Sequence, residues 1–155
     1  MPHMEPTFAF EAMESILKMQ KGDLIRLSEG ITDSHKNPFL FVRHQCRCMQ
    51  HLHDHVLLEI RRCIIHTIDV SKNEDAREHI MACFESTENF MSLIHRIRIV
   101  LPIGDDFEMN AELETNLAYR KVNRAIIIDF LMQCKAHLDN SIIQMENARE
   151  HMNIT

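Results

Sequence analysis

Apolar side chains recur at alternating steps of three and four residues along most of this chain, and that spacing predicts long amphipathic helices. We call the buried row of each helix its seam. Four segments carry such a seam, and we expect helices at residues 7–30, 37–69, 71–101 and 110–151. Only three glycines and four prolines occur in 155 residues, so few turns are expected. Alternating steps of three and four are typical of helices that pack as in coiled coils.

The short connections between these segments place consecutive helices side by side in opposite directions. We therefore predict an all-α, antiparallel up-down-up-down bundle of four long helices. We expect one domain over residues 7–152, preceded at 1–6 by an unstructured end or an expression remnant. At 1.5 Å per residue the first helix is roughly 36 Å long and the fourth roughly 60 Å, so we expect the fourth to bend or overhang.

Capping residues mark where the helices begin. Thr7 follows a proline, and Asn37 precedes one that fits the first helical position. Ser71 with Glu74 three residues later has the spacing of a capping box for the third helix. Asn110 is a candidate cap for the fourth helix.

The second helix, Asn37 to Asp69, combines a long seam with five of the eleven histidines and three of the five cysteines. Its predicted seam is Val42, Cys46, Met49, His53, Val56, Ile60, Cys63 and Thr67, and Leu52, Leu57, Ile64 and Ile68 widen the seam to the breadth of a core-facing helix. A histidine inside a seam is expected to be a core residue with a hydrogen-bond partner, since an unpaired buried polar group costs about 1–3 kcal/mol.

A second row of side chains lies on the opposite face of this helix. At 100° per residue a stripe roughly 60° wide contains His44, Cys48, His51 and His55. Pairs three or four apart can chelate zinc or another divalent transition metal, with Glu59 as a further carboxylate. The four side chains span roughly 16 Å, so a closed site needs ligands from another helix or a second copy. A solvated histidine-rich face and a pH-sensitive interface are the alternatives.

The fourth helix contains the most apolar turn of the chain, residues 125–132, and two arginines interrupt its seam just before that turn. Such a turn is either fully enclosed or meets another chain. The predicted partner-binding residues are Ile126, Ile128, Phe130, Met132, Arg120 and Arg124. The expected partner is a protein, a helical peptide or a second copy of this chain in a homodimer.

Composition excludes several classes of function. The net charge of −6 argues against a dedicated nucleic-acid binder, which displaces counterions with a basic surface. No apolar run approaches the roughly 18 residues that indicate a membrane span. The five cysteines are odd in number and sit mostly at helix-interior positions, so we expect reduced thiols and an intracellular location, cytoplasmic or nuclear.

No glycine-rich phosphate loop and no serine or cysteine in a recognisable nucleophile context occurs in the sequence, so we do not expect an enzyme. The sequence favours a non-catalytic interaction module, an adaptor or scaffold subunit. A metal-binding bundle is the first alternative. An RNA-associated complex subunit, acting through Arg120, Lys121 and Arg124, is the second.

Overall fold

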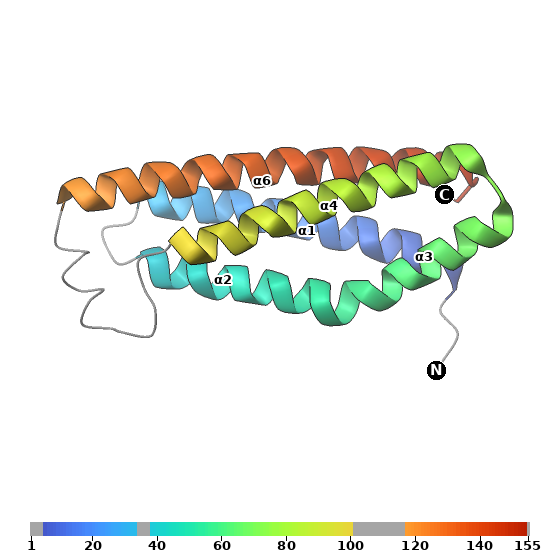
Figure 1. The fold of residues 1–155 in the computed structure, drawn as a ribbon, viewed down its shortest axis with the longest axis horizontal. Helices are drawn as coiled ribbons and strands as arrows, with labels where there is room; N and C mark the ends of the chain where they lie inside the picture. Colours follow the sequence, from blue (N-terminus) through green and yellow to red (C-terminus); the bar gives the residue numbers. More distant parts are fainter. Residues whose placement is uncertain (1–4, 34–37, 101–116, 155) are drawn as a thin grey trace.

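A computed structural model of the chain describes residues 5–33, 38–100 and 117–154. Its helices form four rods laid side by side (Figure 1). The elements are α1 (Pro6–Asp33), α2 (Pro38–Leu52), the π-helical turn η1 (His53–Leu57), α3 (Leu58–Ser71), α4 (Glu74–Val100) and α6 (Leu117–His151). The second rod is continuous, because α2, η1 and α3 follow one another without a break. The described part of the chain contains no strand.

Consecutive rods run in opposite directions, which confirms the predicted all-α, up-down-up-down bundle (Figure 1). The most extensive contact is between α4 and α6, and α6 also packs along α1. The second rod closes the bundle by contacting α1 on one side and α4 on the other. At 35 residues α6 is the longest helix, and its first turns extend past the end of α4 (Figure 1). The predicted start of this helix at Asn110 lies outside the described residues.

Three of the four predicted seams form the core without change. The described residues at the predicted core positions are Phe10, Met13, Leu17, Gln20, Leu24, Leu27 and Ile31 in α1, Ala76, Ile80, Cys83, Thr87, Phe90, Ile94 and Ile97 in α4, and Ile127, Leu131, Cys134, Leu138, Ile142 and Met145 in α6. All of them are buried. The α1 and α4 seams alternate steps of three and four, whereas the α6 seam takes two successive steps of four between Cys134 and Ile142. Helix α1 runs unbroken through Gly22 and Gly30 to Asp33, so neither glycine ends it.

The seam of the second rod differs from the prediction after His53. The sequence places Val56, Cys63 and Thr67 in the core, whereas Val56 is 44% exposed and the other two are half-buried. From the end of η1 onward the buried residues are Leu57, Ile60, Ile64 and Ile68. Ile60 belongs to the predicted seam, and the other three were predicted to flank it. Hydrogen bonds from i to i+5 in a π turn add a residue to that turn, which rotates the core-facing side of the rod toward these flanking residues.

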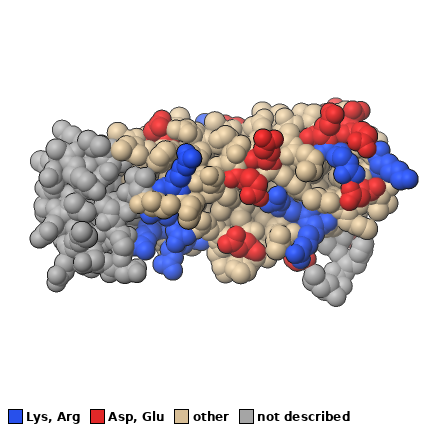
Figure 2. Space-filling view, in the orientation of Figure 1, with Lys and Arg blue, Asp and Glu red and all other residues tan. Residues whose placement is uncertain are grey.

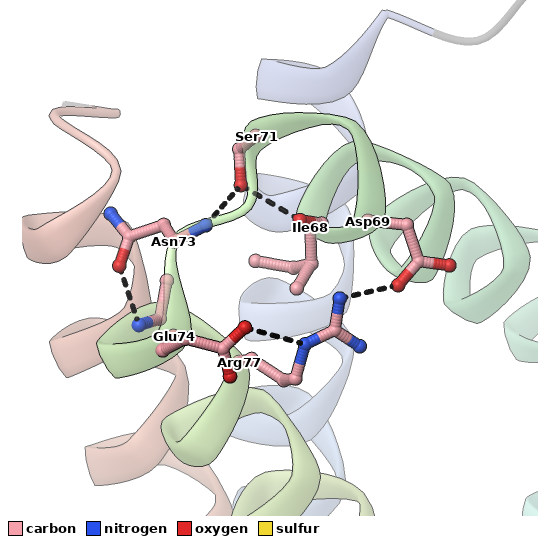
Figure 3. A network of polar contacts seen from close by, with 7 residues as sticks. Ile68, Asp69, Ser71, Asn73, Glu74 and Arg77 are labelled. Atoms are coloured by element: carbon pink, nitrogen blue, oxygen red, sulfur yellow. Dashed lines mark hydrogen bonds and ion pairs between the residues drawn. The ribbon is translucent and has the colours of Figure 1, made fainter.

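The turn between α3 and α4 is fixed by a network of polar contacts (Figure 3). The predicted cap at Ser71 is wrong: α4 begins at Glu74, and Asn73 caps it by accepting the N–H of Ala76 at 3.0 Å. The Ser71 hydroxyl instead donates to the Ile68 carbonyl at 2.8 Å and accepts the Asn73 N–H at 3.2 Å. Lys72 between them adopts the left-handed conformation with φ of 56°.

Asn73 also links the start of α4 to the end of α6. Its Nδ2 donates to the carbonyl of His151 at 3.0 Å, which holds the end of α6 against the start of α4. At the other terminus α1 begins at Pro6, with the Ala9 N–H donating to the Glu5 carbonyl at 3.0 Å. Thr7 therefore lies inside the first turn and does not cap it.

The described helices include none that is both long enough and apolar enough to span a membrane. All five cysteines carry free thiols. Cys46, Cys83 and Cys134 are buried, and burial raises the pKa of each to about 12. These three side chains therefore act as small apolar core residues.

Candidate functional site

The apolar turn of the fourth helix divides between two sides of α6. Alternate residues of an α-helix point about 200° apart, so Ile126 and Phe130 lie on one side while Ile128 and Met132 lie on the other. Ile128 and Phe130 are half-buried and pack against the core, whereas Ile126 is 37% and Met132 55% exposed. The structure does not bring the four predicted apolar residues together on one face.

A groove of about 270 Å³ lies where the Met132 side of α6 meets α1. Its lining consists of Leu24, Ile25, Ser28, Glu29, Leu131, Met132 and Lys135. The two leucines belong to the buried seams and form the floor, while Ile25 (38% exposed) and Met132 form the rim. Glu29 on α1 and Lys135 on α6 place opposite charges on its two walls.

The groove opens where the contacts that hold α1 against α6 give way to shorter side chains. Lys21 Nζ meets Asp139 Oδ1 at 2.6 Å one turn away along the bundle, joining the two helices below the groove. At the level of the groove Ser28 donates to its own helix, to the Leu24 carbonyl at 2.9 Å. A short side chain turned back on its helix leaves space between α1 and α6.

A buried ion pair fixes the two walls of the groove further along the bundle. Glu14 of α1 accepts hydrogen bonds from Arg149 of α6 and from Lys18, whose Nζ lies 3.2 Å away. Burial alone raises the pKa of the Glu14 carboxyl, but the two cations outweigh burial and hold the pKa below its usual range. Glu14 is therefore charged at neutral pH and anchors α1 to α6.

The histidine stripe lies on the outer face of α2 and η1. His44 Nε2 is 3.7 Å from Cys48 Sγ, and the rings of His51 and His55 are 4.4 Å apart between centroids. Zn–N and Zn–S bonds of about 2.0 and 2.3 Å place two ligands of a tetrahedral zinc ion about 3.5 Å apart, so the first pair has nearly the spacing of a chelate.

The stripe does not complete a metal site within the part of the chain that the structure describes. No group of three histidine, cysteine, aspartate or glutamate side chains there can hold one ion. Arg47 lines the same surface hollow as His44, Cys48 and His51, and its charge opposes a bound cation. Glu59 accepts a hydrogen bond from Arg62 Nη1 at 2.8 Å. A third and fourth ligand must come from elsewhere.

His53 has the core role expected of a histidine inside a seam. Its Nε2 lies 3.0 Å from Gln20 Oε1 of α1, and its ring is 5.6 Å from that of Phe90 in α4. Since an amide oxygen only accepts, Nε2 carries the hydrogen. Burial, with a smaller contribution from the Arg61 charge, lowers the pKa of His53 to about 4, so the ring is neutral at pH 7.

The two arginines predicted for partner binding sit at the start of α6, away from the groove. Arg124 is half-buried and makes an interaction of its own, and the side chain of Arg120 lies outside the described part. The groove residues of α1 were not predicted. In the sequence, only Ile25 could have indicated these residues, because it is an apolar residue beside the α1 seam. Its place in the groove follows only from the packing of α1 against α6.

Comparisons of the chain with models of protein families, with curated proteins and with solved structures return no match. Function is accordingly argued from the geometry and chemistry of these surfaces.

Proposed function

We propose that the protein is a non-catalytic interaction module, an adaptor or scaffold subunit, that docks an amphipathic helical segment of a partner protein between α1 and α6. The observation that carries this proposal is the groove with an apolar floor of Leu24 and Leu131 and an exposed apolar rim of Ile25 and Met132. Helical ligands lay one apolar face into a groove of this kind, using side chains spaced three or four residues apart.

The charges on the walls support a defined orientation of the partner. Glu29 stands on the α1 wall and Lys135 on the α6 wall. A bound helix with a basic side chain toward α1 and an acidic one toward α6 satisfies both, whereas the reversed helix places like charges together. The occupant is thus an amphipathic segment with opposite charges on its two flanks.

The size of the groove sets the strength of docking. Full burial of a leucine or phenylalanine side chain contributes about 1.5–3 kcal/mol. A groove of about 270 Å³ takes one or two such anchors. Association costs offset much of that gain, so we expect weak, reversible binding in the micromolar range, about −8 kcal/mol at best.

A displayed library of amphipathic helical peptides, panned against the wild-type protein, supplies the ligand for the test. We expect Met132→Glu and Ile25→Glu each to weaken binding of the selected peptide about tenfold or more, because each puts a charge on the apolar rim. Ile143→Glu is the matched control, since Ile143 is 53% exposed on the same helix and does not line the groove. Equal loss in all three variants, or a library without binders, contradicts the proposal.

A second copy of the chain is the competing occupant of this side of α6. Analytical ultracentrifugation of the wild type and of Ile128→Glu distinguishes the two. A monomer in both cases supports docking of a different protein. A dimer that the substitution dissociates replaces the proposal with self-association.

Metal binding is a second candidate function, and the 3.7 Å separation of His44 Nε2 and Cys48 Sγ favours it. The ligand is zinc or another divalent transition metal, with the coordination completed by a second copy of the chain. Elemental analysis of protein purified without a polyhistidine tag tests it. Less than about 0.2 metal per chain, with no effect of His44→Ala and Cys48→Ser on thermal stability in added zinc, rules it out.

A further inference from the structure

The charges of this chain are strongly segregated along its sequence. Residues 38–53, 89–100 and 115–128 contain seven of the 17 lysines and arginines and none of the 23 aspartates and glutamates. The seven are Arg43, Arg47, Arg96, Arg98, Arg120, Lys121 and Arg124. The remainder of the chain, with ten basic and 23 acidic side chains, is strongly acidic.

The fold brings these three segments to one end of the bundle. Their described residues are α2 with the first residue of η1, the last turns of α4 and the first turns of α6, and α4 packs against both α2 and α6 in antiparallel fashion. Figure 2 shows basic side chains gathered next to the grey end of the molecule, where α2 and α4 adjoin. We call the surface formed by Arg47, Arg96, Arg98 and Ile99 the basic end.

Arginines elsewhere in the bundle are neutralised by carboxylates. Arg61 Nη1 meets Glu88 at 2.5 Å, and Arg77 Nη2 meets Asp69 at 2.7 Å. At the basic end Arg98 instead donates to the neutral amide of Gln50 on α2. Its charge is therefore held in place, and no carboxylate of residues 5–33, 38–100 and 117–154 forms an ion pair with it.

Arg47 and Arg96 project from this surface as its most accessible charges. Both are exposed, and neither forms an ion pair within the described part of the chain. Arg43 and Arg124 make other interactions and add to the field without being open donors. The accumulated positive potential attracts an anionic partner.

One large apolar side chain lies exposed among these charges. Ile99 of α4 is 68% exposed. Ser86 hydrogen-bonds to Asn140 of α6 and so marks the side of α4 that faces α6. Ile99 follows 13 residues later, so at 100° per residue it projects about 140° away from that side, next to Arg98 and one turn from Arg96.

We propose that the basic end binds an acidic amphipathic segment of a partner protein, as a docking surface separate from the α1/α6 groove. A segment with glutamates or aspartates around an apolar anchor pairs with Arg47, Arg96 and Arg98 while covering Ile99. A short peptide stays within the basic end. A long nucleic acid instead extends over the acidic remainder of the bundle, which repels its phosphates.

Fluorescence anisotropy tests this surface with a labelled helical peptide of about 18 residues that carries leucines on one face and glutamates elsewhere. We expect Arg47→Glu with Arg96→Glu to weaken binding about tenfold or more, and Ile99→Ser to weaken it severalfold. The matched control is Arg62→Glu with Lys72→Glu, which makes the same change of net charge at exposed sites in the opposite half of the bundle. It should change affinity by less than about twofold.

Further measurements distinguish peptide docking at the basic end from docking in the groove and from nucleic-acid binding. Met132→Glu in the groove should leave the affinity for this peptide unchanged, so failure of either docking surface is seen independently of the other. Three results overturn the proposal: equal weakening by the two charge-reversal pairs, tighter binding of a single-stranded oligonucleotide of equal length that depends on Arg47 and Arg96, or no peptide binding at low salt. Thermal melting by circular dichroism confirms that each variant is folded.

Discussion

His53 occupies the first position of the π turn, and its surroundings favour a neutral ring. The imidazole contacts Gln20 of α1 and Phe90 of α4, so it joins three rods of the bundle at one level. Withdrawal from water raises the free energy of the charged form, and the Arg61 guanidinium adds repulsion. The pKa of His53 is about 4 in the folded chain, against an ordinary value of 6.5.

This difference predicts that the fold loses stability as pH falls from about 6.5 toward about 4. Within that window the unfolded chain binds a proton at His53 and the folded chain does not, so acid favours unfolding. The expected loss from His53 is about 1–3 kcal/mol, at about 1.4 kcal/mol per pKa unit. Urea denaturation of the wild type and of His53→Gln at pH 7.5 and 4.5 measures it.

The glutamine variant keeps a hydrogen-bond donor toward Gln20 but does not titrate. Protonation of Glu14, whose pKa is also lowered in the fold, destabilises both proteins as pH falls and cancels in the comparison. If the free energy of unfolding falls equally in the wild type and in His53→Gln between pH 7.5 and 4.5, the lowered pKa of His53 is contradicted.

At the scale of the element, Asn73 should contribute more than Ser71 to the stability of the turn between α3 and α4. Asn73→Ala removes the acceptor for the Ala76 N–H and the donor to His151, so we expect it to cost about 1–2 kcal/mol. Ser71→Ala is the matched control and should cost less than about 0.5 kcal/mol, because Ser71 is exposed. Thermal denaturation of the two variants measures this difference. A larger loss of stability in Ser71→Ala than in Asn73→Ala would mean that Ser71 caps α4.

The π turn makes a sharper prediction about which residues are core. Leu57 is fully buried and Val56 is not, so Leu57→Ala should cost about 2–5 kcal/mol and Val56→Ala less than about 1 kcal/mol. Chemical denaturation of the two variants measures this. A larger effect at Val56 means that the second rod is a regular α-helix and that η1 does not form.

The periodicity of the sequence was sufficient to predict the core positions of α1, α4 and α6, because all of these positions except Gln20 and Thr87 are apolar and most residues between them are polar. In the second rod it was not sufficient. Val56 and Leu57 are both apolar, as are Cys63 and Ile64, so the sequence is compatible with two phases. Only the packing against α1 and α4 selects the phase that buries Leu57 and Ile64.

The candidate groove was predictable only in part for a similar reason. Met132 was predicted as a partner-binding residue of a turn that is apolar nearly all round, and it lines the groove. The other wall belongs to α1, which lies more than 90 residues earlier in the sequence, and no local pattern reports which helix faces which. Ile25 and Glu29 gained a functional interpretation only from the pairing of α1 with α6.

At the scale of the whole molecule, the bundle carries candidate surfaces in two places. The Met132 side of α6 forms the groove with α1, whereas the basic end lies on α2 and the end of α4. Ion pairs such as Lys21 with Asp139 hold α1 in register with α6, so the groove is preformed. Two separate docking surfaces on one compact bundle suit a subunit that bridges partners.

The central claim, that a partner helix docks between α1 and α6, is tested most directly by methyl NMR on the protein titrated with the library-selected peptide. We predict that the methyl signals of Ile25 and Met132 shift or broaden most, because these side chains form the rim. Met81 and Ile143, equally exposed on other surfaces, should stay unchanged. Largest shifts at Met81 or Ile143, with Met132 unmoved, would contradict the account.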